Sequence, residues 1–310
     1  NFPQTLRATL GYDRRLPFGF VGSFEGLFTQ NLNDFFYTNL GIVERATTDA
    51  NGRVMYGNIT QTVPTNGNPA SPTTGARVTV ARAQAGFNDV IDVKNTSKNY
   101  SYNLTAEVRR RFSEAFEFSA AYAFSRVRDV QSPTSSQGIS NWRFGRSISG
   151  SHNSERTGVS LFDVPHKMIL SGTYSFRTKT DLSVIYVGNS GVPFEYIYLS
   201  YDANADGATN DLIYVPTAEE VASTGMFREG ASLGGVTYTA DQQAEAFEEF
   251  VQNSECLRKQ RGAILERNSC RSPWQNLVNV SVRQRLPNLG GNELALQLDV
   301  FNFMNLINKE

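Results

Sequence analysis

The chain has 310 residues and a formal net charge of −1, with 29 Lys and Arg against 30 Asp and Glu. Because the positive and negative charges nearly cancel, the chain has no general attraction to nucleic acid or anionic lipid, and nucleic acid is not an expected partner. Aromatic residues reach 12%, yet no apolar run approaches the ~18 residues of a membrane-spanning helix, which excludes a helical membrane protein.

Alternation of apolar and polar residues predicts eight β-strands. In chain order they cover 4–16, 18–30, 100–109, 116–125, 166–177, 181–197, 277–286 and 292–304. In the seventh, for example, Val278, Val280 and Val282 alternate with polar residues. Each strand therefore has one apolar and one polar face.

Charged residues are concentrated on the polar faces, where they suit a water-filled or plugged lumen. Those expected to face the lumen include Arg7, Glu25, Glu107, Arg109, Glu117, Arg283 and Asp299. The opposite face, which includes Val280 and Leu298, is expected to face lipid.

Connections of two lengths alternate along the chain. Tight turns near 16–17, 113–116, 177–180 and 287–292 are separated by long polar links of about 31–96, 130–163 and 198–273. Loops beyond ~15 residues are uncommon in compact domains, whereas outer-membrane barrels combine short periplasmic turns with long extracellular loops. A soluble β-sandwich also alternates, but its strands usually hold only ~5–6 residues. The pattern predicts an all-β fold, an antiparallel transmembrane β-barrel segment.

The third link contains a loop with the ligand spacing of a calcium site, "YDANADGATNDLIYVP" at 201–216. An EF-hand-like count assigns oxygen ligands to Asp202, Asn204, Asp206, the Ala208 carbonyl and Asn210, with Asp211 compensating for Ile213 at the last position. Calcium is the expected ion. The alternative is an Asx-rich turn, in which these side chains bind nearby backbone N–H groups.

The two cysteines, Cys256 and Cys270, lie in the same link. An even pair outside the cytoplasm is more often bridged than free, so we expect a disulfide. Closing a loop of about 15 residues would contribute ~3 kcal/mol in the chain-entropy model.

Short helices are also expected in this link. Thr217 and Glu220 have the spacing of a capping box, and Phe247, Phe250 and Val251 mark one helical face. Nucleophile elbows, phosphate-binding glycine loops and zinc motifs do not occur, so no enzymatic activity is expected.

Three stretches resemble one family. "FDVPHKMILSGTYSF" (162–176), "GNSGVPFEYIYLSYDANADGATNDLIYVP" (188–216) and "LALQLDVFNFMNLINKE" (294–310) are similar to segments of TonB-dependent outer-membrane receptors of the Oar-like group. The resemblance implies a barrel of about 22 strands around an N-terminal plug. Residues 1–310 then form a partial barrel domain, about strands fourteen to twenty-one, without plug or TonB box and with a strand missing after Glu310.

The resemblance implies import of an extracellular ligand of unknown identity. The expected partners are the lipid bilayer, a plug domain, the remaining barrel strands and a TonB-type energy coupler. The alternative is a non-transporting surface protein, an adhesin or assembly scaffold on a small eight-stranded barrel. Because so narrow a barrel is filled by side chains, long charged residues inside it would be costly. We therefore expect that strands 4–16 and 292–304 do not pair with each other.

Overall fold

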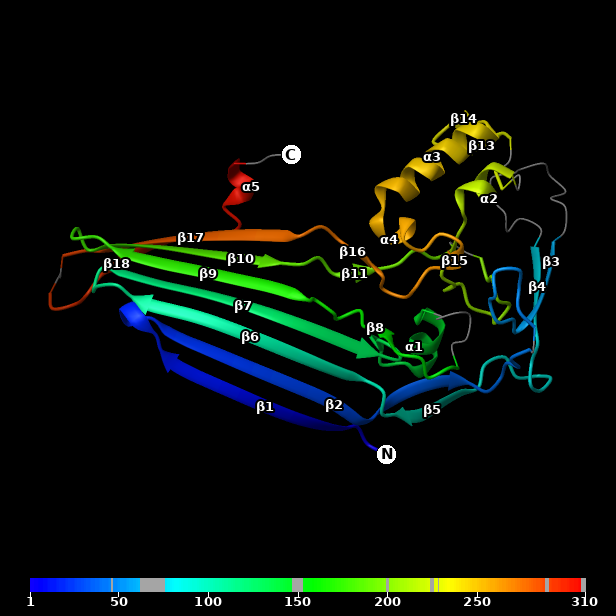
Figure 1. The fold of residues 1–310 in the computed structure, drawn as a ribbon, viewed down its shortest axis with the longest axis horizontal. Helices are drawn as coiled ribbons and strands as arrows, with labels where there is room; N and C mark the ends of the chain where they lie inside the picture. The colour runs from blue at the N-terminus through cyan, green and yellow to red at the C-terminus, as the bar shows by residue number, and fades with distance from the viewer. Residues whose placement is uncertain are drawn as a thin grey trace.

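In the computed structural model, an antiparallel sheet dominates the molecule (Figure 1). The structure describes residues 1–45, 47–61, 76–146, 153–198, 201–223, 226–227, 229–287 and 290–307. In spatial order, the main strands are β1 (Gln4–Arg15), β2 (Val21–Asn39), β6 (Tyr100–Arg111), β7 (Phe116–Asp129), β9 (His166–Ser175), β10 (Thr180–Asn189), β17 (Gln275–Arg285) and β18 (Ala295–Val300). Neighbours in the sheet follow one another along this path, and two further strands of the sheet pair with β2 and β7.

The register gives the sheet one apolar and one polar face. Directly opposite residues of antiparallel strands share a face, and Val280 is opposite Val184 in β10 and Val300 in β18. Following the register across the sheet places the predicted lumen residues together on the other face: Glu107, Arg109, Glu117, Arg283 and Asp299. The shared face is as expected, whereas its position in a lumen stays a prediction.

Aromatic rings cluster at both ends of the apolar face. Near the tight turns the clustered rings are Phe20, Phe112, Phe116, Tyr174 and Phe176. Toward the long links they are Tyr102, Tyr122 and Phe124, together with His166. Phe116 and Phe124, eight residues apart on β7, are separated by ~26 Å along the strand. These rings therefore lie where the aromatic girdles of a barrel border its apolar band of ~25 Å.

Strand β2 is longer than predicted. It continues from Val21 to Asn39 because β5 (Ile91–Thr96) pairs with Asp34–Asn39 beyond the aromatic cluster. The first link therefore leaves the sheet only after Asn39, not at 31. Regular alternation fails at Phe35 and Phe36, and the side chain of Phe36 is buried in the external region.

Strand β10 is shorter than the predicted 181–197. It ends at Asn189, and the chain then turns away from the sheet into β11 (Pro193–Phe194), which pairs with β16 (Cys270–Arg271). The turn brings Gly191 against the backbone of Ser272, where a side chain would not fit. The third link therefore begins at about 190, eight residues before the predicted boundary.

Strand β18 is also shorter than the predicted 292–304. After Val300 the chain bends at Asn302, whose φ is 51°, and enters α5 (Met304–Ile307). The bend is held by a bond from the Phe303 amide to the Val278 carbonyl, at 2.7 Å. Among the described residues, β1 pairs only with β2 and β18 only with β17, so the expectation that the first and last strands do not pair is confirmed.

The tight turns lie at one end of the sheet and the long links at the other (Figure 1). At the turn end, η1 (Pro17–Gly19) connects β1 to β2. At the link end, the first link contains the hairpin β3 (Gly57–Gln61) and β4 (Ala76–Val80). The second link contains α1 (Gly138–Phe144) and β8 (Gly158–Val159), which pairs with β7.

The third link folds around a core of its own. Its further elements are α2 (Ala218–Ser223), α3 (Ala240–Asn253), α4 (Glu255–Arg258), the pair β12 (Tyr214–Val215) and β15 (Ala263–Ile264), and the hairpin β13 (Ala231–Leu233) and β14 (Val236–Tyr238). Leu212, Val251 and Leu257 are fully buried in this core. The predicted capping box is present, with Thr217 and Glu220 each accepting from the other's amide.

A second external core joins all three long links. It contains Ile42 and Tyr56 from the first link, Trp142 from α1 and Ala208 from the third link. In the part of the chain that the structure describes, no helix is long and apolar enough to cross a membrane.

Candidate functional site

The loop 202–211 lies where the three long links meet. The Tyr56 amide of the first link donates to the Asn204 carbonyl at 2.8 Å. Arg53 donates to Asp211 at 3.1 Å and to the Leu212 carbonyl. From the second link, the Arg143 carbonyl accepts from the side chain of Asn210 at 2.6 Å. The loop therefore fastens the third link to the other two.

Within the loop, side chains accept from backbone amides. Asp202 accepts from the amides of Asp206 and Gly207, at 3.1 and 2.8 Å. Asp206 accepts from the Ala208 amide at 2.7 Å. These bonds close a tight turn that includes left-handed backbone at Gly207, whose φ is 92°. This is the arrangement expected of the Asx-rich alternative.

The loop also buries more negative charge than its cation partner balances. Burial, together with the charges of Asp202 and Asp211, raises the pKa of Asp206 to about 8. Burial raises the pKa of Asp211 and the charge of Arg53 lowers it; the net result is a pKa of about 6. Burial also raises the pKa of Asp202, against its bonds from backbone amides. One arginine thus faces three buried carboxyl groups.

The six predicted calcium ligands are all buried in this loop: Asp202, Asn204, Asp206, Ala208, Asn210 and Asp211. The side-chain oxygen of Asn210 has no hydrogen-bond partner in the described part of the chain. However, among the described residues no three His, Cys, Asp or Glu side chains are grouped as metal ligands. The structure therefore brings the predicted residues together, and the calcium ion stays a prediction.

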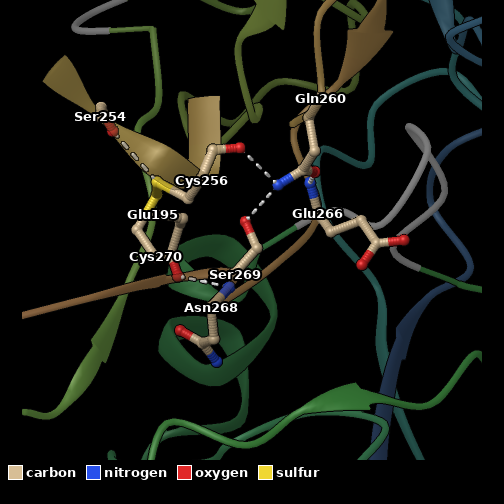
Figure 2. The surroundings of a disulfide bond; sticks show 8 residues. All are labelled: Glu195, Ser254, Cys256, Gln260, Glu266, Asn268, Ser269 and Cys270. Carbon is tan, nitrogen blue, oxygen red and sulfur yellow. Dashed lines mark hydrogen bonds between the residues drawn. A yellow bond between two sulfur atoms is a disulfide. The ribbon is translucent and has the colours of Figure 1, made fainter. Parts of the chain in front are cut away.

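Cys256 and Cys270 form the predicted disulfide (Figure 2). The bond joins α4 to β16, and both half-cystines pack in or against the core of the third link. Beside it, Gln260 donates to the Cys256 carbonyl at 3.1 Å and to Ser269 at 3.0 Å. The disulfide therefore closes the end of the third link just before β17.

Two ion pairs anchor the third link, a buried pair to the sheet and a half-buried pair to the second link. Arg267 binds Asp129 at the end of β7, at 2.7 Å, and Arg271 binds Asp163. Sequence reasoning missed these pairs because the arginines lie outside any periodic segment. The one signal that could have found them is that both arginines are close in sequence to Cys270, in a segment that a disulfide would hold in place.

The external region also contains cavities. One of about 590 Å³ lies beside the disulfide and is lined in part by the rings of Phe194, Tyr196 and Phe250. The rings of Phe194 and Phe250 each meet that of Tyr196 edge to face, with 5.4 Å between centroids. A second cavity, of about 410 Å³, is lined by three arginines at the outer end of β7. Neither was predicted, because each combines residues distant in sequence.

The long antiparallel strands, the continuous apolar face and its two aromatic clusters define an outer-membrane β-barrel. The family model for an outer membrane beta barrel domain matches residues 39–309, and the chain belongs to this family. The protein therefore resides in the bacterial outer membrane, with its apolar face in contact with the lipid bilayer. No curated protein matches the sequence significantly.

Proposed function

We propose that the chain is part of the barrel of a TonB-dependent receptor that imports an extracellular ligand. In this proposal, further strands continue β1 and β18 and close the barrel around a plug domain. An inner-membrane energy coupler of the TonB type opens the path. The observation that carries the proposal is the open eight-stranded path combined with its charged polar face.

The charges of the polar face support a wide, water-filled or plugged interior. Within the described residues, Glu25, Arg109 and Glu117 have no ion-pair partner within 4.0 Å. An eight-stranded barrel leaves room for side chains alone, and unpaired charges buried there would be costly. A larger lumen supplies water or a plug surface to these groups.

The external region supports ligand recognition. Its links have two buried cores, a disulfide and two anchoring ion pairs, so they present an ordered surface outside the membrane. An adhesin or assembly scaffold would also use such a surface. What favours import over this alternative is the charged polar face, together with the resemblance of 162–176, 188–216 and 294–310 to TonB-dependent receptors.

Binding of the energy coupler tests the proposal. The complete protein is purified from outer membranes, and its affinity for the purified periplasmic domain of the organism's own TonB-type proteins is measured. We expect saturable binding that a peptide of the receptor's TonB box competes away. Lack of binding by a correctly folded receptor would favour the non-transporting surface protein.

A further inference from the structure

We propose that the cavity at the outer end of β7 binds one anionic group, a carboxylate or a phosphate, of an external ligand. We call this site the arginine cavity; it is lined by Arg128, Arg156, Glu266 and Arg267 together with the backbone at Gly52 and Gly262. The inference deepens the proposed receptor function and rests on it for the ligand's role in import. Binding itself can be measured on purified protein without transport.

All three long links contribute to the walls. Gly52 comes from the first link, Arg156 from the second, and the segment 262–267 from the third. Gly52 and Gly262 both have left-handed backbone, with φ of 80° and 74°, a conformation that side chains rarely adopt. At these two positions the cavity is therefore lined by backbone without a side chain.

Arg267 forms a fixed cationic floor. It is 5% exposed, and its two terminal nitrogens donate to the Val130 carbonyl, the Asp129 carbonyl and the Asp129 carboxylate, at 2.6 to 2.7 Å. Its Nε is buried, and no group in the described part of the chain accepts from it. The guanidinium is thus held in place with one donor unused.

Arg128 contributes the uncompensated charge. It is half-buried at the outer end of β7, opposite Val159 of β8. No carboxylate of the described residues lies within ion-pair distance of it. Burial lowers the pKa of Arg267, the carboxylates of Asp129 and Glu195 raise it, and the charge of Arg128 lowers it again. The two guanidinium groups that line the cavity therefore repel each other, and an anion bound by both would relieve the repulsion.

The rim consists of exposed side chains of both signs, Arg156 and Glu266. Glu266 directs its carboxylate away from the disulfide and from Gln260 (Figure 2). Because the lining also contains the carboxylate of Glu266, we expect a ligand with a single anionic group rather than a polyanion.

The planar fork of arginine matches carboxylate and phosphate oxygens, which defines the chemical class of the ligand. A volume of about 410 Å³ exceeds one such group and falls within the ~300–1,000 Å³ of small-molecule sites. The anionic group would therefore belong to a small molecule whose remainder also occupies the cavity.

A lipid phosphate is the main competing source of an anion. Arg126 lies on the same face of β7, two residues nearer the membrane, with its guanidinium carbon 5.9 Å from the centroid of the Phe124 ring. It does not line the arginine cavity. Arg126→Gln is therefore a matched control for Arg128→Gln, because both remove one guanidinium from the same strand face.

The test is calorimetric titration of the purified, detergent-solubilised protein with inorganic phosphate and, separately, with acetate, at constant ionic strength. We expect saturable binding of at least one of the two anions. Arg128→Gln should weaken it about tenfold or more, as loss of a charge-assisted hydrogen bond implies. The exposed Arg156→Gln, which cannot disturb a core, should weaken it severalfold, and Arg126→Gln should leave it unchanged.

Three results would overturn the inference. Saturable binding of neither anion would remove the site. Affinity unchanged in both Arg128→Gln and Arg156→Gln would place the anion elsewhere. An equal loss in Arg126→Gln would assign the anion to the strand face, as for a lipid headgroup. None of these results bears on coupler binding, so failure of this inference is distinguishable from failure of the proposed receptor function.

Discussion

At the scale of single residues, Asp206 makes the external region sensitive to pH. Its folded-state pKa of about 8 lies above the ordinary value of 3.8, so the folded protein holds this proton more tightly than the unfolded chain does. Without a bound cation, the free energy of unfolding should therefore fall as pH rises from about 4 to about 8. Asp206→Asn should remove the share of this fall that is due to Asp206, leave the shares of Asp202 and Asp211, and stabilise the region at pH 8.

The measurement is denaturant unfolding of the external region at several pH values, followed by the fluorescence of Trp142. This residue is buried beside Ala208 in the second external core, and Trp274→Phe removes the other tryptophan. Asp241→Asn, which removes an exposed carboxylate of the same region, is the control. An identical pH dependence in Asp206→Asn and in the parent would contradict the prediction.

Calcium, where it binds, would reverse this dependence. An ion that neutralises Asp202 and Asp206 stabilises the folded loop by mass action, so millimolar calcium should raise the unfolding free energy at pH 8. Asp206→Asn should abolish most of this gain. If calcium at equal ionic strength has no effect on the parent protein, the Asx-rich turn is a sufficient account of the loop.

Only part of the structure of the loop 202–211 could be predicted from the sequence. Its residue spacing predicted a compact turn rich in Asp and Asn, because those side chains act within a few residues of themselves. The partners Arg53, Tyr56 and Arg143 could not be predicted, since they come from other links. The arginine cavity could not be predicted either, because its lining residues also come from separate links.

At the scale of elements, β17 offers a test of orientation in the membrane. Val280 lies on the apolar face, midway along the strand, and Ser281 lies on the polar face. Val280→Arg should cost ~2–4 kcal/mol if the position is near the bilayer midplane. Ser281→Arg, its matched control, should cost much less. The free energies of unfolding of the two variants are compared by refolding equilibria in lipid vesicles. A larger cost at Ser281 would invert the two faces.

The disulfide offers a second test, confined to the third link. Cys256→Ser with Cys270→Ser should destabilise the fold of this link by ~3 kcal/mol in the chain-entropy model, while the sheet stays folded. Limited proteolysis should then cut between α3 and β16 well before the strands. Equal protease resistance in both forms would mean that the buried core alone holds the link.

Strand alternation predicted the sheet well because the lipid-facing side must stay apolar at every second residue. The prediction from alternation failed beyond the membrane, where no face of a strand has to stay apolar. β2 continues past the aromatic cluster with β5 as partner, and β10 stops early at Asn189, where the chain turns into the external region. Outside the membrane, burial in the link cores replaces the regular alternation.

At the scale of the whole molecule, the account depends on an open sheet. The apolar face is continuous from β1 to β18, but in the described part of the chain the two outermost strands, β1 and β18, each have only one neighbour in the sheet. The charged polar face needs a lumen wider than eight strands enclose. A barrel of more than eight strands with a plug inside it is therefore the central proposal.

The most direct test is a cryo-electron microscopy structure of the protein purified from the outer membrane. The account predicts a barrel of more than eight strands, in which β1 and β18 each pair with a strand outside residues 1–310 and a plug contacts the face that holds Glu117 and Arg283. A closed barrel in which β1 pairs directly with β18 would contradict it.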